Sequence, residues 1–160
     1  MSIRVIVDMS ATLLHHGHIR LLRKAAKYGE VVVGLSSDKD IEKYKGHIPL
    51  LTWKYRKEIL ESIRYVSEVV ETPYIITNAV LEEHGAQFLI HGADNFNTVS
   101  KDRLIIFPRT PAISSNMLVE YNRQHKFIKH STSSESVAKM HYETQIANNS
   151  DPRITQQTTN

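Results

Sequence analysis

The chain of 160 residues contains no cysteine, which excludes disulfide bonds, a thiol nucleophile and cysteine-ligated metal centres. Glycine and proline are sparse, at six and five residues, so most of the chain is not a low-complexity sequence. It has no apolar run long enough to span a membrane and no recognisable secretory signal. These absences lead us to expect a globular, cytoplasmic protein without a membrane span.

Neither sign of charge dominates the sequence. There are 20 Lys and Arg residues against 17 Asp and Glu residues, and the basic residues are dispersed. Binding to nucleic acid would need a concentrated basic stripe with aromatic residues, so we predict no nucleic-acid partner. Hydrophobic residues make up 41% of the chain, which is enough for one sizeable core at this length.

Hydrophobic patterning alternates between strands and helices. This alternation predicts an α/β fold, a Rossmann-like three-layer α/β/α sandwich with a parallel five-stranded sheet. The segment 37–51 is charged and holds Gly46 and Pro49, so we predict a mobile loop there. The strands are expected near 3–8, 30–36, 67–71, 87–91 and 103–108, and the helices near 17–28, 52–64, 77–85 and 114–124.

The last thirty residues differ in kind from the rest. Sixteen of residues 131–160 are Ser, Thr, Asn or Gln, which leaves too few apolar side chains to offset the entropy of ordering a second core. We predict one domain over 1–130 and a polar, flexible tail or linker over 131–160. A short helix over 136–147 is an open alternative.

The motif His15-His16-Gly17-His18 stands between the first predicted strand and the first predicted helix. Free N–H groups and the helix dipole make a helix N-terminus an anion site, and Gly17 lets phosphate approach the main chain closely. Ligands of open α/β sheets bind at the carboxyl ends of the strands, so the motif predicts a nucleoside triphosphate site. Half of a zinc site is the alternative, but no second His pair has ligand spacing.

Several further motifs follow in order. They are Lys45-Gly46, Tyr55-Arg56-Lys57-Glu58, Arg64-Tyr65-Val66-Ser67-Glu68-Val69-Val70, His91-Gly92-Ala93-Asp94 and Pro108-Arg109-Thr110-Pro111-Ala112-Ile113-Ser114-Ser115-Asn116. With the histidine motif they resemble, from about residue 3 to about residue 122, the nucleotidylyltransferases with a His-x-Gly-His motif. Within these, the resemblance is to cytidylyltransferases that act on glycerol 3-phosphate or phosphocholine.

The resemblance implies a role for each matching residue. It makes His15, His18, Lys45 and Arg109 catalytic, holding the triphosphate and stabilising charge around phosphorus. The nucleotide-binding residues that it implies are Ser10, Ala11, Gly17, Arg56, Gly92, Asp94, Thr110, Ile113, Ser114 and Ser115.

Three of these assignments have simpler alternatives. Lys45 could be one more solvated lysine, and Ser114 and Ser115 could act as helix caps, which is compatible with phosphate binding. Arg56 could pair with an acid of its own helix, but the positions three and four away hold none. Because the arginine fork suits phosphate, we predict that Arg56 binds CTP or the acceptor.

The sequence departs from the family pattern at positions expected near the ligand. Thr12 stands where relatives have an aspartate, and Ala93 and Asn95 replace an acid and a tryptophan. In the last motif, Ala112 replaces a glycine and Asn116 a threonine. Lost acids would change how magnesium is held, so the metal ligands stay unidentified. The run Met9-Ser10-Ala11-Thr12 resembles the cytidylyltransferase domains associated with phosphoenolpyruvate mutase in phosphonate biosynthesis, which implies a phosphonate acceptor.

The resemblance therefore implies a cytidylyltransferase that uses CTP and Mg²⁺, transfers CMP to a small phosphate or phosphonate, and releases pyrophosphate. An adenylyltransferase using ATP is the close variant. A nucleotide-binding module with little or no catalysis is the alternative that Thr12, Ala93 and Asn95 leave open. The segment Arg64 to Val70 resembles a dimer interface of the family, so we expect a homodimer, unless these residues belong only to the core.

Overall fold

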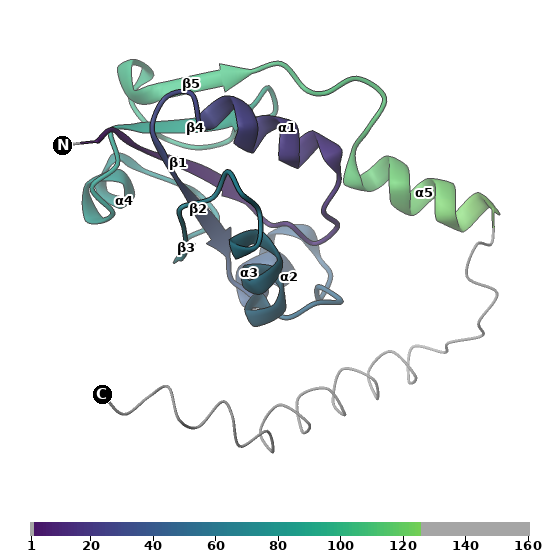
Figure 1. The fold of residues 1–160 in the computed structure, drawn as a ribbon. Coiled ribbons are helices and arrows are strands. Elements are labelled where there is room, and N and C mark those ends of the chain that lie inside the picture. The colour runs from purple at the N-terminus through teal and green to yellow at the C-terminus, as the bar shows by residue number, and fades with distance from the viewer. Residues whose placement is uncertain (1, 126–160) are drawn as a thin grey trace. The chain divides into compact units, whose positions relative to one another are not determined.

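Five strands form one parallel sheet in the computed structural model, which describes residues 2–125 (Figure 1). The strands are β1 Arg4–Met9, β2 Glu30–Ser36, β3 Glu68–Thr72, β4 Phe88–Gly92 and β5 Leu104–Phe107. They are arranged in the order β3-β2-β1-β4-β5, and each neighbouring pair is parallel. The predicted parallel sheet is confirmed, with every strand end within one residue of its predicted position.

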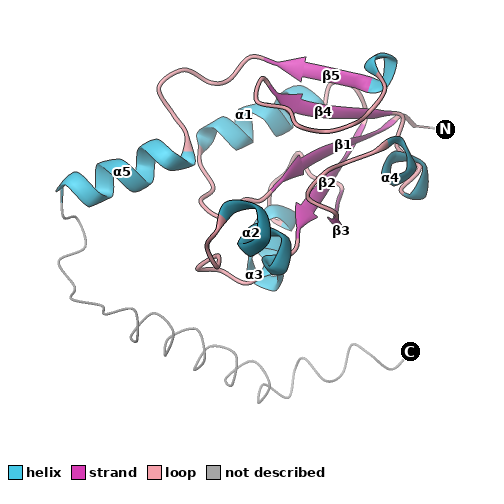
Figure 2. Cartoon of the chain, turned by 180° about the vertical axis from the view of Figure 1, so that it is seen from behind, coloured by secondary structure: helices cyan, strands magenta, loops and turns pink. Residues whose placement is uncertain are grey.

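The strand order reverses its direction beside β1. The chain builds β1, β2 and β3 outward on one side and then returns to place β4 and β5 on the other. The strand arrows run in the same general direction and fan out with the twist of the sheet (Figure 2). Such a reversal opens a crevice at the carboxyl ends of the two central strands, where open α/β sheets bind ligands.

Helices cover both faces of this sheet. They include α1 His16–Ala25, α3 Trp53–Glu61 and α4 Asn78–Glu83, and a 3₁₀ turn occupies Lys101–Arg103. The other helices are α2 Asp38–Lys45, which follows β2, and α5 Ser115–His125, which has no buried residue and does not cover the sheet. Val5 of β1 packs in a cluster with Leu22 of α1 and Leu60 of α3, whereas the adjacent Ile6 packs with Leu81 of α4. Successive strand residues point to opposite faces, so the predicted three-layer sandwich is confirmed.

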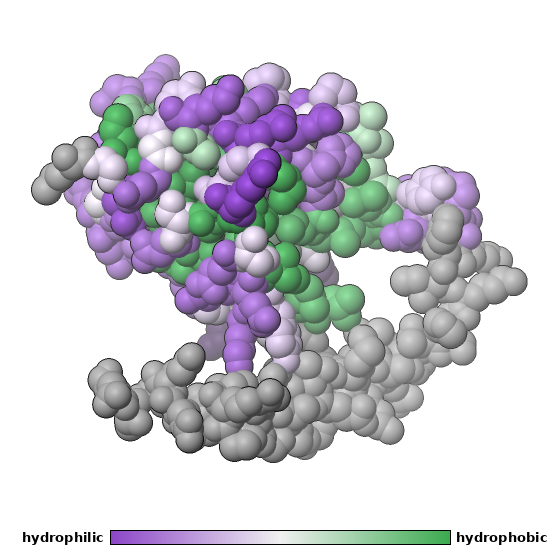
Figure 3. All heavy atoms as spheres, in the orientation of Figure 1, coloured by the Kyte–Doolittle hydropathy of each residue, from purple (hydrophilic) through white to green (hydrophobic). Residues whose placement is uncertain are grey.

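The first helix presents two different faces. Leu22 and Ala25 are fully buried, while Arg20, Arg23 and Lys27 nearby are exposed. Polar side chains cover the outer side of α1 in Figure 3. Burial of each large apolar side chain contributes about 1.5–3 kcal/mol, which fixes the orientation of the helix and of its N-terminal histidines.

The structure corrects the predicted loop over 37–51, because α2 occupies Asp38–Lys45. The Ser37 side chain accepts a hydrogen bond from Asp40 N, and Ile41 is buried. Gly46 ends the helix with a φ of 71°, a left-handed conformation that favours glycine. Acids in the first turn and lysines in the last turn complement the helix dipole, so the charges that suggested a loop stabilise a helix.

One compact unit runs from Met1 to Tyr121 and so holds all five strands. The domain boundary predicted at residue 130 and the tail predicted over 131–160 lie outside the described residues. Within residues 2–125, no helix combines the length and the apolar character needed to cross a lipid bilayer.

Gly29 is expected to be essential for the turn between α1 and β2. A Cβ at this position would overlap the carbonyl oxygen of Ile3, which accepts a hydrogen bond from Glu30 N at 2.7 Å. We expect Gly29→Ala to lower the free energy of unfolding by about 1–3 kcal/mol, as overpacking does, in urea denaturation. The exposed neighbour Lys27→Ala serves as the control, and equal stability of the two variants would contradict the prediction.

Candidate functional site

A cavity of about 560 Å³ lies at the carboxyl ends of the central strands. Its walls come from the end of β1, the N-terminus of α1, the end of β4 and the segment that follows β5. Its volume falls within the range of small-molecule sites. Twelve of the fourteen predicted site residues line it, namely Ser10, His15, Gly17, His18, Lys45, Gly92, Asp94, Arg109, Thr110, Ile113, Ser114 and Ser115.

The two histidines form a reciprocal cap at the start of α1. His15 Nδ1 accepts a hydrogen bond from Gly17 N at 3.1 Å, and His18 Nδ1 accepts one from His15 N at 3.2 Å. A neutral imidazole whose Nδ1 accepts carries its hydrogen on Nε2. Both rings therefore carry an Nε2–H donor that makes no hydrogen bond within residues 2–125, and their centroids are 4.0 Å apart.

The environment keeps these rings neutral. Burial, helped by the charges of His15 and Lys45, lowers the pKa of His18 to about 4. Burial also lowers the pKa of His15, with His16 and Arg109 adding to the effect. The histidines consequently act as uncharged hydrogen-bond donors at neutral pH.

Two cations line the same cavity as the histidines and act on their charge. Lys45 is the last residue of α2, and burial lowers its pKa while the Asp94 carboxylate opposes that change. Arg109 follows β5 and lies 3.4 Å from Asp94, with both side chains about half exposed. An ion pair this exposed is weak, so the Arg109 guanidinium is available to an anionic ligand.

The predicted serines differ in their contacts. Ser114 Oγ accepts a hydrogen bond from Met117 N at 3.1 Å, which is the cap that the simpler alternative described. Ser115 Oγ donates to the carbonyl oxygen of Leu13 at 3.2 Å. This bond joins the start of α5 to the loop before the histidines, so the two segments that are predicted to bind phosphate are fixed to each other.

Asp8 lines the cavity although it was absent from the predicted site. Its Oδ2 accepts a hydrogen bond from Asn97 Nδ2 at 3.0 Å and lies 3.6 Å from His91 Nε2. Within the described part of the chain its Oδ1 is buried without a hydrogen-bond partner, and burial raises its pKa against the opposing effect of His91. The signal in the sequence was a single acid near the carboxyl end of an apolar strand.

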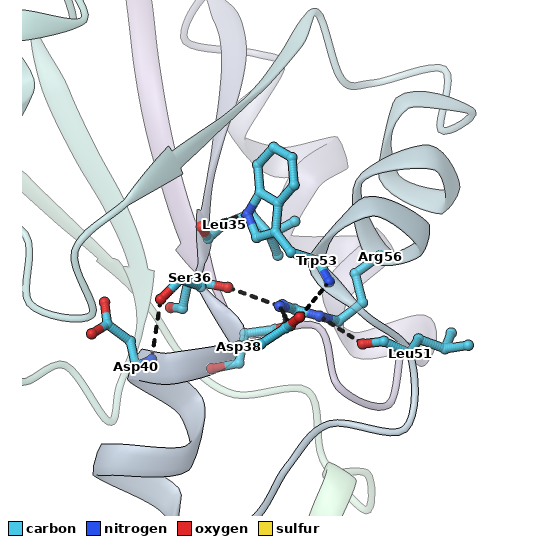
Figure 4. Close-up of polar contacts among 9 residues, drawn as sticks. Leu35, Ser36, Asp38, Asp40, Leu51, Trp53 and Arg56 are labelled. Carbon is cyan, nitrogen blue, oxygen red and sulfur yellow. Dashed lines mark hydrogen bonds and ion pairs between the residues drawn. The ribbon is translucent and has the colours of Figure 1, made fainter. Parts of the chain in front are cut away.

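Arg56 lies behind the cavity wall rather than in it, which corrects the prediction that it binds the nucleotide or acceptor. Arg56 is buried, with 1% of its surface exposed. Its guanidinium forms an ion pair with Asp38 at 2.6 Å (Figure 4). Asp38 belongs to α2, so a search for acids along the helix of Arg56 could not find it. Arg56 thus has a partner inside the protein.

Ala11 also does not line the cavity. It is buried and has a φ of 47°, and Ala112 has a φ of 56°, so both occupy the left-handed region that costs a non-glycine residue roughly 1–2 kcal/mol. Each strained residue lies next to cavity-lining residues, Ser10 and Ile113 respectively. The surrounding fold therefore keeps the backbone in a strained conformation at two segments that border the cavity, at Ala11 and at Ala112.

Some departures from the family pattern line the cavity, as Asn116 does, and others lie outside it. Thr12, Ala93 and Asn95 do not line it, and Asn95 Oδ1 accepts a hydrogen bond from Asn97 N at 3.2 Å. Among residues 2–125, no group of three or more His, Cys, Asp or Glu side chains could hold a metal ion. Asp8 and Asp94 are the two carboxylates on the cavity wall.

Comparison with known proteins agrees with this geometry. A family model described as "Cytidylyltransferase-like" matches residues 11–140. The chain is 36% identical to the ethanolamine-phosphate cytidylyltransferase of Mus musculus over 99 residues, which are 61% of this chain and 24% of that protein. It is 32% identical to the glycerol-3-phosphate cytidylyltransferase of Bacillus subtilis (strain 168) over 124 residues, 73% of this chain and 95% of that protein.

A solved structure shares the fold. The lipopolysaccharide core biosynthesis protein of Thermoplasma volcanium GSS1 superposes with a TM-score of 0.59 and 20% sequence identity, over 69% of this chain and 99% of that one. The chain spans about a quarter of the length of the ethanolamine-phosphate relatives that it matches.

The neutral state of His18 has a measurable consequence. The ring is neutral in the folded protein down to about pH 4, whereas an unfolded histidine takes up a proton near pH 6.5. The His18 contribution to stability should therefore be complete above pH 6.5 and decline as the pH falls towards 4. An NMR titration of the His18 ring should give a pKa near 4, and a value near 6.5 would contradict the burial argument.

Proposed function

Because the chain belongs to the cytidylyltransferase-like family, we propose that it transfers CMP from CTP to a small acceptor that bears a phosphate or phosphonate group. The observation that carries the proposal is the pair of neutral histidines at the start of α1, opposed by Lys45 and Arg109. This set of donors surrounds a cavity that fits a polyanion.

The proposed reaction is a displacement at the α-phosphorus of CTP. An oxygen of the acceptor phosphate or phosphonate attacks, a new P–O bond forms, and the bond to the β-phosphate bridging oxygen breaks to release pyrophosphate. The attacking oxygen is already anionic at neutral pH, so no strong general base is needed. His15 and His18 donate Nε2–H bonds and Lys45 and Arg109 supply positive charge, which stabilises the negative charge that develops on the departing pyrophosphate oxygen in the transition state.

We propose that CTP enters with Mg²⁺, which neutralises part of the triphosphate charge. Mg²⁺ in phosphate sites is commonly bound by one or two carboxylates together with phosphate oxygens and water. Asp94 fits this requirement because its carboxylate is 45% exposed at the cavity. Asp8 fits less well, since it is buried and paired with Asn97.

We propose further that the acceptor carries an ammonium group. The buried Oδ1 of Asp8 lacks a partner among the described residues, and an ammonium ion offers three donors and the charge that favours an ionised carboxylate. A relative is named for ethanolamine phosphate, which has such a group. Ethanolamine phosphate and 2-aminoethylphosphonate present the same ammonium beside nearly the same anion, so both belong to this class.

Glycerol 3-phosphate is the second candidate acceptor. The relative named for it is covered over 95% of its length, whereas the ethanolamine-phosphate relative is covered over 24%. The uncharged hydroxyl groups of glycerol 3-phosphate would donate hydrogen bonds to the Asp8 carboxylate without adding a positive charge. The dependence of the reaction on Asp8 distinguishes the two classes.

A homodimer through the region Arg64–Val70 is also part of the proposal. The region includes the start of β3, which is an outer strand of the sheet, and Arg64, Ser67 and Glu68 are exposed. An outer strand has backbone groups that a second copy can cover.

The cytoplasmic setting and the lack of a nucleic-acid partner stay predictions.

The reaction is tested by pyrophosphate release with Mg²⁺, each of the four nucleoside triphosphates and each candidate acceptor. Release is expected only with CTP and one acceptor class, and His18→Ala should lower kcat by about 100-fold or more, as loss of a transition-state donor does. His16→Ala is the matched control because His16 does not line the cavity. Release with ATP would identify an adenylyltransferase, and CTP binding without release would identify a binding module.

Asp8→Asn tests the ammonium group of the acceptor. Loss of the negative charge removes a charge-assisted interaction, so the KM for ethanolamine phosphate or 2-aminoethylphosphonate should rise by about 10- to 100-fold. The KM for CTP is the internal control and should stay within about twofold. If glycerol 3-phosphate is the better acceptor and its KM is unaffected by Asp8→Asn, the ammonium proposal is wrong.

A further inference from the structure

The Arg56 guanidinium joins three segments of the chain, which are the residue after β1, the junction of β2 with α2, and the loop before α3. Its Nε donates to the carbonyl oxygen of Leu51 at 3.2 Å, its Nη1 to that of Ser10 at 2.5 Å, and its Nη2 to that of Ser36 at 2.9 Å. The same Nη2 donates to Asp38 Oδ1 at 2.6 Å (Figure 4). A fully buried charge thus has acceptors on all three of its nitrogens.

Two of these segments lead directly to the cavity. Ser10 lines it and follows β1, just before the strained residue Ala11 and the histidine loop. Asp38 is the first residue of α2, and Lys45 is the last. One guanidinium therefore fixes both the approach to the histidines and the start of the helix that carries the opposing lysine.

Asp38 makes a second contact that secures α2. Its Oδ2 accepts a hydrogen bond from Trp53 N at 3.0 Å, at the start of α3, where the Thr52 side chain makes no cap bond. The indole Nε1 of Trp53 in turn donates to the carbonyl oxygen of Leu35 at 3.2 Å. The Asp38 carboxylate is thus a cap for α3 as well as the partner of Arg56.

Tyr74 also contacts α2. Tyr44 stacks on Tyr74 with ring centroids 4.5 Å apart and an interplanar angle of 11°, and Asp40 Oδ2, in the first turn of α2, accepts a hydrogen bond from Tyr74 N at 3.2 Å. Tyr44 is 46% exposed, so we expect its stacking to hold the Lys45 end more weakly than the bonds of Asp38 hold the other end. Tyr74 itself lines the cavity.

We propose that Arg56 and Asp38 are a positioning pair that sets Lys45 of α2 at the distance from His15 and His18 that the triphosphate requires. The inference rests on the proposed function. An eight-residue helix is about 12 Å long, so a tilt of about 5° at Asp38 moves the Lys45 end by about 1 Å. A displacement of this size in a catalytic site can cost 100-fold in rate.

Two variants test the pair, Arg56→Lys and Asp38→Asn. Lys45→Met is the reference variant that lacks the lysine charge, and Arg103→Lys is the matched control. Arg103 also bonds to two backbone carbonyls, those of Gln87 and Ala86 at 3.1 and 2.7 Å, and to the Glu82 carboxylate at 3.4 Å, but it does not line or adjoin the cavity. Arg56→Lys keeps the charge and loses the fork of donors. Asp38→Asn keeps an acceptor and loses the charge, so it is the milder variant if Arg56→Lys does not fold.

The first readout is the pKa of His18 by NMR, which the charge of Lys45 lowers. If Lys45 moves away, the pKa of His18 should rise in Arg56→Lys and in Asp38→Asn. The rise should be towards the value measured in the reference variant Lys45→Met. It should not change in Arg103→Lys. This readout requires a folded protein but neither substrate nor turnover, so it tests the positioning pair even where no pyrophosphate is released.

The second readout is steady-state kinetics. Arg56→Lys and Asp38→Asn should lower kcat/KM for CTP by about 10- to 100-fold, with the acceptor KM little changed, and Arg103→Lys should stay within about twofold. An unchanged His18 pKa, or kinetic losses no larger than those of Arg103→Lys, would show that the pair only stabilises the fold and would overturn the inference. Absence of activity in the unmodified protein would instead reject the proposed function.

Discussion

A buried guanidinium must keep its donors paired, because the desolvation of an unpaired charge costs several kcal/mol. Arg56 meets this requirement with the carbonyl oxygens of Ser10, Leu51 and the last residue of β2, and with Asp38. The acceptors come from segments that are far apart in the sequence and meet only in the folded chain. This constraint fixes the loops at the carboxyl edge of the sheet, and the cavity of the candidate site is formed by the same loops.

The architecture could be predicted from the sequence because its signals are local. Runs such as Val31–Val33 are β-branched and bounded by turn residues, and the helix after Gly17 repeats apolar residues at helical spacing. Alternation of the two element types then allows few topologies, since right-handed crossovers and short connections exclude most others. The position of the histidine motif could also be predicted from local signals, because the motif lies between a strand pattern and a helix pattern.

Contacts between distant segments could not be predicted in this way. The partner of Arg56 is Asp38, which is 18 positions earlier and on another helix, so a search along one helix face found no acid. Asp8 was overlooked because its importance comes from burial and from the approach of Asn97, 89 positions away. The helix α2 was missed because Ile41 is its one fully buried residue, which leaves almost no periodic signal.

In the reaction that we propose, the neutral histidines would affect the release of the product. Four positive groups around a triphosphate would attract the departing pyrophosphate as strongly as they attract the substrate, and product release would then limit turnover. Here two of the four groups donate hydrogen bonds without a full charge. We therefore expect the proposed site to stabilise negative charge through the direction and distance of its donors, and to hold pyrophosphate less tightly than a site of four cations would.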